Sequence, residues 1–281
     1  MVREALHVAR SGIQRTVTAK LYGHVASDER HAVHEALVTV ATLLHDADHP
    51  SLVPPIDVGV LEGVPVAIYP RLRGVRSLAT ILLQRPAGSS RLPFDAALIV
   101  ALAVAEAIAA AHDVGLVHGE LSTRQVLVTA SGEVKVTDFG EYRTSQGTSG
   151  VQRSIPLGER LAHVPPEIVS GARPTRASDV FSLGVLLHTL LLGPRFRRDE
   201  TSDAILDAVR EGRVVRPILA PVLSEELANV LHGALARRPE DRLTAGEIVT
   251  ALRGVLLAAN IPDVRSFLVW AARPAPVDAD S

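Results

Sequence analysis

The sequence of 281 residues has no cysteine, few aromatic residues (3%) and almost no lysine. Without cysteine, disulfides, thiolate catalysis and cysteine-based zinc sites are excluded. The formal net charge of −2 argues against a basic nucleic-acid-binding surface, so we expect no nucleic-acid partner. Only Lys20 and Lys135 are lysines among 29 basic residues. Arginine therefore supplies the general surface cations, and each lysine calls for a specific explanation.

Long uninterrupted apolar runs are also missing. The most apolar stretch, Ala96 to Ala111, contains Glu106 and is followed directly by His112 and Asp113. The residues after Met1 lack the basic-then-apolar order of a signal peptide. We therefore expect no membrane span in this chain and, given the absence of cysteine, a cytoplasmic location.

The first quarter of the chain has mainly the pattern of strands. Apolar residues recur at helical spacing only from Val33 to Leu44, where Ser27 and Asp28 are candidate N-terminal caps. Elsewhere the apolar residues alternate or form short runs between turn residues. The predicted strands are Val17–Leu21, Leu52–Val58 and Val64–Tyr69, the last two joined by a turn at Glu62-Gly63.

The rest of the chain has mainly helical patterns, and 47% hydrophobic residues suffice for a sizeable core. We predict a small strand-rich lobe over residues 1–74, a larger helical lobe over residues 75–260 and a tail over residues 261–281. The predicted elements are buried helices at Phe94–Val114 and Ala177–Leu192, a hairpin at 126–128 and 134–136, a helix after Ser224 and a capping box at Thr244 and Glu247.

One segment carries most of the chemical information. It begins His118-Gly119-Glu120-Leu121 and includes Gln125, after which the predicted hairpin leads to Asp138-Phe139-Gly140. This order resembles the catalytic core of protein kinases, which reads H-R-D-L-x-x-x-x-N, a hairpin and D-F-G. The resemblance implies an α+β, two-lobed protein-kinase-like fold, with Asp138 at the magnesium-binding position and His118 in a structural role.

Three further matches follow in the order of the family. Pro165-Pro166-Glu167 resembles the A-P-E motif, and Arg242 stands where the family's arginine pairs with that glutamate. Residues 178–184 are similar to the start of the buried helix whose aspartate, here Asp179, braces the catalytic loop. The resemblance extends over about residues 15–257, and it assigns structural roles to Glu167, Asp179 and Arg242.

The small lobe contains candidate nucleotide-binding residues. Val17-Thr18-Ala19-Lys20 resembles V-A-I-K, whose lysine binds the α- and β-phosphates and pairs with a glutamate on the next helix, here Glu35. Tyr69 stands at the gatekeeper position, where its ring narrows the adenine pocket, and Pro70 removes one N–H from the hinge. The alternatives are a surface cation at Lys20, a solvated helix residue at Glu35 and core packing at Tyr69.

The departures from the family pattern concern catalysis. Glu120 replaces the catalytic aspartate, Gln125 the metal-binding asparagine and Gly119 the arginine. Each of the first two adds a methylene, and a displacement of about 1 Å can cost about 10²-fold in rate. A G-x-G-x-x-G loop is also absent, since residues 3–16 contain only Gly12. We therefore expect the first strand and the glycine-rich loop of the small lobe to be missing.

These departures favour a pseudokinase, a signalling or scaffold module with weak or no phosphoryl transfer. It would act on protein partners, such as another kinase or a signalling protein. One alternative is an active, atypical serine/threonine kinase that uses ATP and magnesium with Glu120 as base; another is a nucleotide-free protein-interaction domain. We expect weak or absent ATP and magnesium binding. The residues involved would be Lys20, Glu35, Tyr69, Gln125 and Asp138, with magnesium at Asp138 and Gln125.

Overall fold

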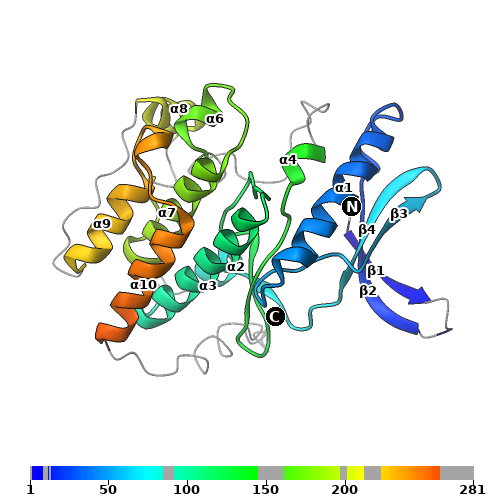
Figure 1. Ribbon diagram of the computed structural model, residues 1–281, viewed down its shortest axis with the longest axis horizontal. Helices are drawn as coiled ribbons and strands as arrows, with labels where there is room; N and C mark the ends of the chain where they lie inside the picture. Colours follow the sequence, from blue (N-terminus) through cyan, green and yellow to red (C-terminus); the bar gives the residue numbers. More distant parts are fainter. Residues whose placement is uncertain are drawn as a thin grey trace, which may run out of the picture.

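The computed structural model has two lobes (Figure 1). An antiparallel sheet and one long helix form the small lobe, and a group of helices forms the large one. The α+β, two-lobed fold predicted from the sequence is thereby confirmed. The structure describes residues 2–8, 12, 14–84, 92–144, 161, 163–196, 201–211 and 223–259.

The sheet of the small lobe has the strand order β1-β2-β4-β3. Lys20 lies opposite Val2 of β1 and Ala67 of β4, so it belongs to an interior strand. The alternative of a surface cation on an edge strand is therefore wrong. The bounds are β1 (Val2–Val8), β2 (Gln14–Leu21), β3 (Asp57–Leu61) and β4 (Val64–Pro70).

Helix α1 (Arg30–Ala47) packs on this sheet through one apolar face. Its buried residues are Val33, Leu37, Val40 and Leu44, spaced three or four apart as on one side of a helix. Val33 and Leu37 form an apolar cluster with three further buried residues, Tyr22, Val25 and Ala67.

Two predictions for the small lobe are wrong in detail, and one strand was not predicted. The strand predicted at Leu52–Val58 begins only at Asp57, because two prolines at 54–55 lack the N–H that a ladder needs. Strand β1 was not predicted. Helix α1 starts after Glu29, which makes no side-chain capping bond, so Ser27 and Asp28 are not its caps.

The large lobe is built around helix α3 (Phe94–Asp113), as predicted. Helices α7 (Arg176–Leu192) and α10 (Ala245–Ala259) pack against it. By length and composition α3 alone among the described helices could cross a membrane, yet its central residues form the core of this lobe. The other elements are β5 (Arg76–Ser77), α2 (Leu78–Leu83), β6 (Val126–Val128), β7 (Val134–Val136), α4 (Glu141–Thr144), α6 (Pro166–Val169), α8 (Ser202–Arg210), α9 (Glu225–Ala234) and the 3-10 helix η1 (Pro239–Asp241).

Two helix starts in the large lobe follow the predicted capping. The Ser224 hydroxyl accepts a hydrogen bond from the Leu227 N–H at the start of α9. Thr244 and Glu247 exchange side-chain and backbone hydrogen bonds at the start of α10, which is the predicted capping box.

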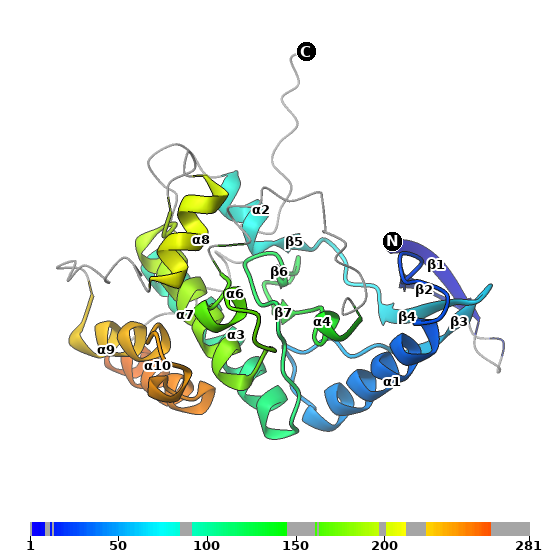
Figure 2. The same cartoon turned by 90° about the horizontal axis from the view of Figure 1, so that it is seen from above.

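The predicted β6–β7 hairpin lies between the helices of the large lobe and helix α1 (Figure 2), and it contacts the segment that follows α1. Leu52, which follows α1, forms a β-bridge with Val136, and Lys135 Nζ donates a 2.8 Å hydrogen bond to the Pro50 carbonyl. Lys135 thus has a structural explanation. Since β7 ends at Val136, this connection places the following Asp138 next to the small lobe.

Candidate functional site

The structure brings Lys20 and Asp138 together although 118 residues separate them in sequence. Lys20 Nζ lies 2.8 Å from Asp138 Oδ1. Asp138 has a φ of +66°, a left-handed conformation that is rare outside glycine and is typical of strained functional positions. Two of the predicted nucleotide-binding residues therefore form one ion pair between the lobes.

Glu141, on the first turn of α4, is the second partner of Lys20. Its Oε1 lies 2.9 Å from Lys20 Nζ and also accepts a 2.7 Å hydrogen bond from the Tyr22 hydroxyl. Burial alone lowers the pKa of Lys20, but the carboxylates of Asp138 and Glu141 outweigh it and hold that pKa above its ordinary value. The ammonium of Lys20 is therefore charged at physiological pH.

The predicted pairing of Lys20 with Glu35 is not present in this structure. Glu35 lies two residues from both Val33 and Leu37, about 200° around the helix from the buried face. Its side chain is 68% exposed and pairs with His31 at 3.3 Å. On this point the structure agrees with the alternative, a solvated helix residue.

Tyr69 packs against the apolar cluster of the small lobe, beside the Lys20 pair. Burial raises the pKa of Tyr69 to about 12, with Lys20 and Glu141 among the charges that act on it. Pro70 ends β4 opposite Val17. The ring thus contributes to packing and also stands next to the candidate phosphate-binding lysine.

The catalytic loop is braced by Asp179 as predicted. Asp179 is 1% exposed and accepts hydrogen bonds from the backbone N–H groups of His118 (2.7 Å) and Gly119 (2.8 Å). His112 Nε2 donates to the same carboxylate at 2.9 Å. The buried ring of His118 lies 4.6 Å from that of Phe139, which joins the loop to the D-F-G segment. Burial lowers the pKa of His118, so its ring is neutral.

Gly119 stands where the family has arginine, and the structure leaves no room for a side chain there. A Cβ on Gly119 would lie 2.2 Å from Cδ1 of Tyr142, and its φ is +85°. Tyr142 of α4 therefore fills the space beside the catalytic loop. The absence of a side chain at Gly119 therefore leaves the space that the Tyr142 ring occupies.

Glu120 and Gln125 line a pocket of about 510 Å³ on the large-lobe side of the site. Glu120 is exposed in it, and the amide oxygen of Gln125 accepts a 2.6 Å hydrogen bond from the Ser122 hydroxyl. Pro165 and Arg173 line the same pocket, whereas Lys20 and Asp138 do not. The two long substitutes thus line the same pocket.

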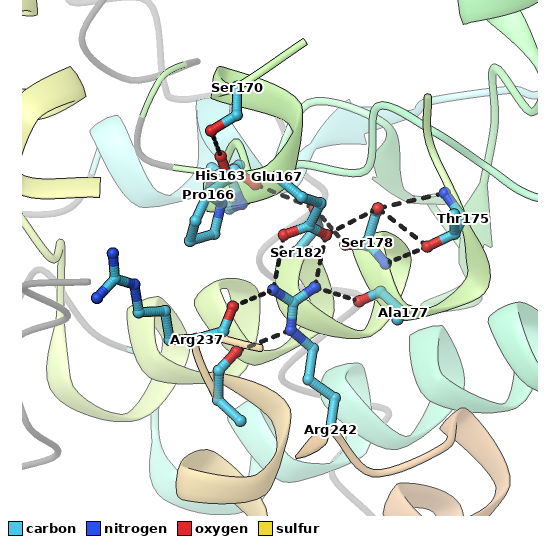
Figure 3. A network of polar contacts seen from close by, with 11 residues as sticks. His163, Pro166, Glu167, Ser170, Thr175, Ala177, Ser178, Ser182, Arg237 and Arg242 are labelled. Atoms are coloured by element: carbon cyan, nitrogen blue, oxygen red, sulfur yellow. Dashed lines mark hydrogen bonds and ion pairs between the residues drawn. The ribbon is translucent and has the colours of Figure 1, made fainter. Parts of the chain in front are cut away.

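Glu167 and Arg242 form a two-pronged ion pair in the large lobe, as predicted (Figure 3). Both contacts measure 2.7 Å, and the Arg242 side chain has no exposed surface. Arg242 also donates to three backbone carbonyls, and the Ser178 hydroxyl donates to Glu167. Burial raises the pKa of Glu167, but the hydrogen bonds from Arg242 outweigh it and lower that pKa overall. We call this group the Glu167–Arg242 clamp.

Oxygen donors suitable for magnesium are few at this site. Asp138 supplies one carboxylate, and magnesium commonly binds one or two carboxylates together with phosphate oxygens and water. Asp138 therefore fits a metal held jointly with nucleotide phosphates. No group of three or more acidic or histidine side chains suited to an ion occurs within the described residues. The predicted ligand Gln125 offers one neutral oxygen, which already accepts from Ser122.

Sequence patterns did not reveal three residues of this site: Tyr22, Glu141 and Tyr142. Glu141 and Tyr142 directly follow D-F-G, so their proximity to Asp138 was the available signal. Tyr22 lies two residues after Lys20, on the same side of the chain by strand alternation. The remaining segment after D-F-G, over residues 145–160, lies outside the described residues.

Comparisons with known proteins agree with this geometry. A family model described as protein tyrosine and serine/threonine kinase matches residues 2–252. Serine/threonine-protein kinase PknK of Mycobacterium tuberculosis is 32% identical over 213 residues, which are 74% of this chain and 18% of that protein. Serine/threonine-protein kinase PknA of Corynebacterium glutamicum is 30% identical over 202 residues, 71% of this chain and 42% of that protein. The probable serine/threonine-protein kinase CPE1738 of Clostridium perfringens is 25% identical over 223 residues, 79% of this chain and 32% of that protein.

The chain thus spans less than half the length of these three relatives. The family model, in contrast, covers most of the chain, and the two lobes meet at a lysine and an aspartate at the positions that the motifs indicated. On these grounds, the chain belongs to the protein kinase family.

Proposed function

We propose that this chain is a pseudokinase that retains a nucleotide site and transfers phosphate weakly or not at all. The observation that carries the proposal is the 2.8 Å pair between Lys20 and Asp138, which joins the two lobes. A degenerate domain that no longer binds a nucleotide would have no need for the partly buried Lys20 ammonium beside Asp138, whose backbone is strained.

The residues of this pair have complementary tasks toward ATP. The Lys20 ammonium presents three donors and a full charge to phosphate oxygens. The Asp138 carboxylate would supply a ligand to a magnesium ion bound together with the phosphates. Magnesium, when bound, neutralises phosphate charge, while Lys20 and Asp138 orient the nucleotide between the lobes.

Weak transfer is supported by the other half of the site. Glu120 and Gln125 each extend one methylene beyond the residues of the family, and both line the large-lobe pocket. If the base and the second metal ligand are each displaced by about 1 Å, the reacting atoms are no longer held at reaction distance, and the rate of phosphoryl transfer falls. Tyr142 occupies the space beside Gly119, so no arginine there can hold a phosphorylated segment.

Calorimetry with ATP tests the nucleotide site. The purified chain is expected to bind ATP more tightly with magnesium than without, and Lys20→Met is expected to weaken binding at least about 10-fold. Asp138→Asn should remove the magnesium dependence. Arg210→Met is the control: it removes one positive charge from an exposed pair with Asp207 on α8 and should bind like the wild type. No binding by the wild type at millimolar ATP would instead support a nucleotide-free interaction domain.

The second candidate function is an active serine/threonine kinase in which Glu120 acts as base. The relatives PknK and PknA, both named serine/threonine-protein kinases, favour it. The double variant Glu120→Asp, Gln125→Asn separates the two candidates in a phosphotransfer assay to a generic protein substrate. A pseudokinase should gain activity when the shorter side chains are restored. An enzyme adapted to the longer ones should lose it, by about 10²-fold for a displacement of about 1 Å.

The partners that we propose are proteins. The large-lobe pocket, with Glu120, Arg173 and prolines in its wall, offers charged and apolar groups suited to an extended peptide. A cytoplasmic signalling or scaffold role, with another kinase or signalling protein as partner, accords with the absence of cysteine. Crosslinking of the purified chain to candidate partners, with and without ATP, would test it.

A further inference from the structure

We propose that Glu141, rather than a carboxylate of helix α1, is the residue that holds the Lys20 ammonium in position to meet phosphate. This inference rests on the proposed nucleotide site and adds a positioning residue to it. Three independent features of the structure support it: the apolar face of α1, the geometry around Glu141 and the division of carboxylates around Lys20.

Helix α1 offers no acidic side chain to the site. Its buried face consists of Val33, Leu37, Val40 and Leu44, and Val40 is the residue that meets the D-F-G segment. A Cβ on Gly140 would lie 2.7 Å from Cγ2 of Val40. The helix therefore approaches the site with hydrocarbon, and both of its acidic residues, Glu35 and Asp46, are exposed.

Glu141 has the geometry of a fixed counter-ion. Its side chain is only 13% exposed, and its Oε1 lies 2.9 Å from Lys20 Nζ. The same oxygen accepts the hydrogen bond of the Tyr22 hydroxyl, and Tyr22 is 1% exposed in the apolar cluster under α1. The Tyr22 hydroxyl thereby fixes the Glu141 carboxylate to the small lobe. Tyr22 follows the end of β2, two residues after Lys20, the ion-pair partner of Glu141.

Two carboxylates around one ammonium allow a division of tasks. Asp138 can turn toward a magnesium ion with its nucleotide while Glu141 continues to neutralise Lys20. Without Glu141, a lysine that is 19% exposed would lose its remaining counter-ion whenever Asp138 bound metal. A largely buried ammonium without a counter-ion is costly, so Lys20 would be held less favourably in the site.

The first experiment needs no nucleotide and uses the fact that the chain has only two lysines. The reactivity of Lys20 toward an acylating reagent, relative to that of Lys135, is measured by mass spectrometry at a series of pH values from 8 to 12, where the wild-type Lys20 reactivity should still be rising at the highest pH. In Glu141→Gln the Lys20 profile should move to lower pH by about one to three units, because an adjacent opposite charge is lost. Glu141→Asp should restore much of the shift, and Glu35→Gln, the matched control, should leave the profile unchanged.

Tyr22→Phe keeps the carboxylate and removes only its hydrogen bond, so it should produce a smaller shift in the same direction. It also serves as the second variant if Glu141→Gln does not fold, which circular dichroism would reveal. A Lys20 profile that is unchanged in Glu141→Gln, or that moves equally in Glu35→Gln, would overturn the inference. A gain in exposure alone would raise reactivity at every pH without moving the midpoint, and that outcome would overturn it too.

The second experiment measures binding of ATP with magnesium to the same variants. Glu141→Gln should raise the dissociation constant about 10-fold and Glu35→Gln should not change it. If the wild type binds no ATP, the proposed function fails while the reactivity profile still decides whether Glu141 holds Lys20. If the wild type binds and Glu141→Gln binds equally well, the positioning role is refuted while the nucleotide site stands.

Discussion

The Glu167–Arg242 clamp and the Lys20 site are both ion pairs between distant segments, yet they differ in what surrounds them. The clamp is enclosed within the large lobe, and Arg242 satisfies its remaining donors on backbone carbonyls. The Lys20 site lies between the lobes, where Asp138 remains partly exposed. A satisfied, enclosed pair contributes to a single folded state, whereas a pair at an interface can exchange a partner for a ligand.

The two regions also differ in how well they follow the family pattern. The clamp has the expected residue at each of its positions. At the Lys20 site, the lysine and aspartate are as expected, while the second carboxylate comes from α4 instead of α1. The clamp thus keeps both the residues and the pairing of the family, whereas the Lys20 site keeps the residues but pairs the lysine with a different carboxylate. Four variants test this difference, and they are given in order of decreasing expected effect.

Arg242→Met should have the largest effect on stability. It leaves the Glu167 carboxylate without its buried partner and strands three carbonyls, so the free energy of unfolding should fall by about 3–5 kcal/mol. Urea unfolding followed by circular dichroism measures the loss. Arg238→Met is the control, because that arginine pairs with Glu240 on the surface, and it should unfold like the wild type.

Glu167→Gln should cost less at neutral pH, about 1.5–3 kcal/mol, because the amide oxygen still accepts one hydrogen bond. The pKa of Glu167 is lowered in the folded protein, so the ionised carboxylate stabilises the fold above its ordinary pKa of 4.5. This contribution is lost as the pH falls through the lowered value. The gap between wild type and variant in urea unfolding should therefore narrow below about pH 4.5, and a constant gap down to pH 3 would contradict the assigned pairing.

Gly119→Ala should destabilise the fold by at least about 1 kcal/mol, because the backbone has a positive φ and the new Cβ meets Tyr142. In the double variant Gly119→Ala, Tyr142→Ala the stability lost to the clash with the ring should be recovered, while the stability lost to the strained backbone should not. Thermal unfolding distinguishes the two contributions. Gly254→Ala is the control: it lies in α10 with open space around it and should be neutral or stabilising.

Glu35→Gln should have the smallest effect, with no measurable change in unfolding or in ATP binding. The pair of Glu35 with His31 is exposed, and such pairs contribute little. Calorimetry with ATP and magnesium is the measurement. A clear loss of affinity would show that α1 turns its glutamate toward Lys20 when nucleotide binds, which would make the two regions more alike than the present structure indicates.

Motifs made most of the fold predictable. The helices α3 and α7 follow from long apolar patterns, the hairpin β6–β7 from alternation, and the clamp from the two positions 167 and 242 that the family resemblance pairs. The strand that begins at Asp57 was predicted to begin at Leu52, because the apolar residues at 52–53 have a strand pattern. The two prolines that follow prevent a strand there. Capping of α1 failed for a similar reason, since local polar residues do not decide where packing against the sheet begins.

By itself, the sequence determined which residues carry charge, where the chain can form helices and strands, and the order of its motifs, because these depend on near neighbours. The tertiary structure decided which carboxylate meets Lys20 and which side chain fills the space at Gly119. Both outcomes depend on how closely α1 and α4 approach the D-F-G segment. The sizes of Val40 against Gly140 and of Tyr142 against Gly119 set that approach, and both contacts join residues that lie apart in the sequence.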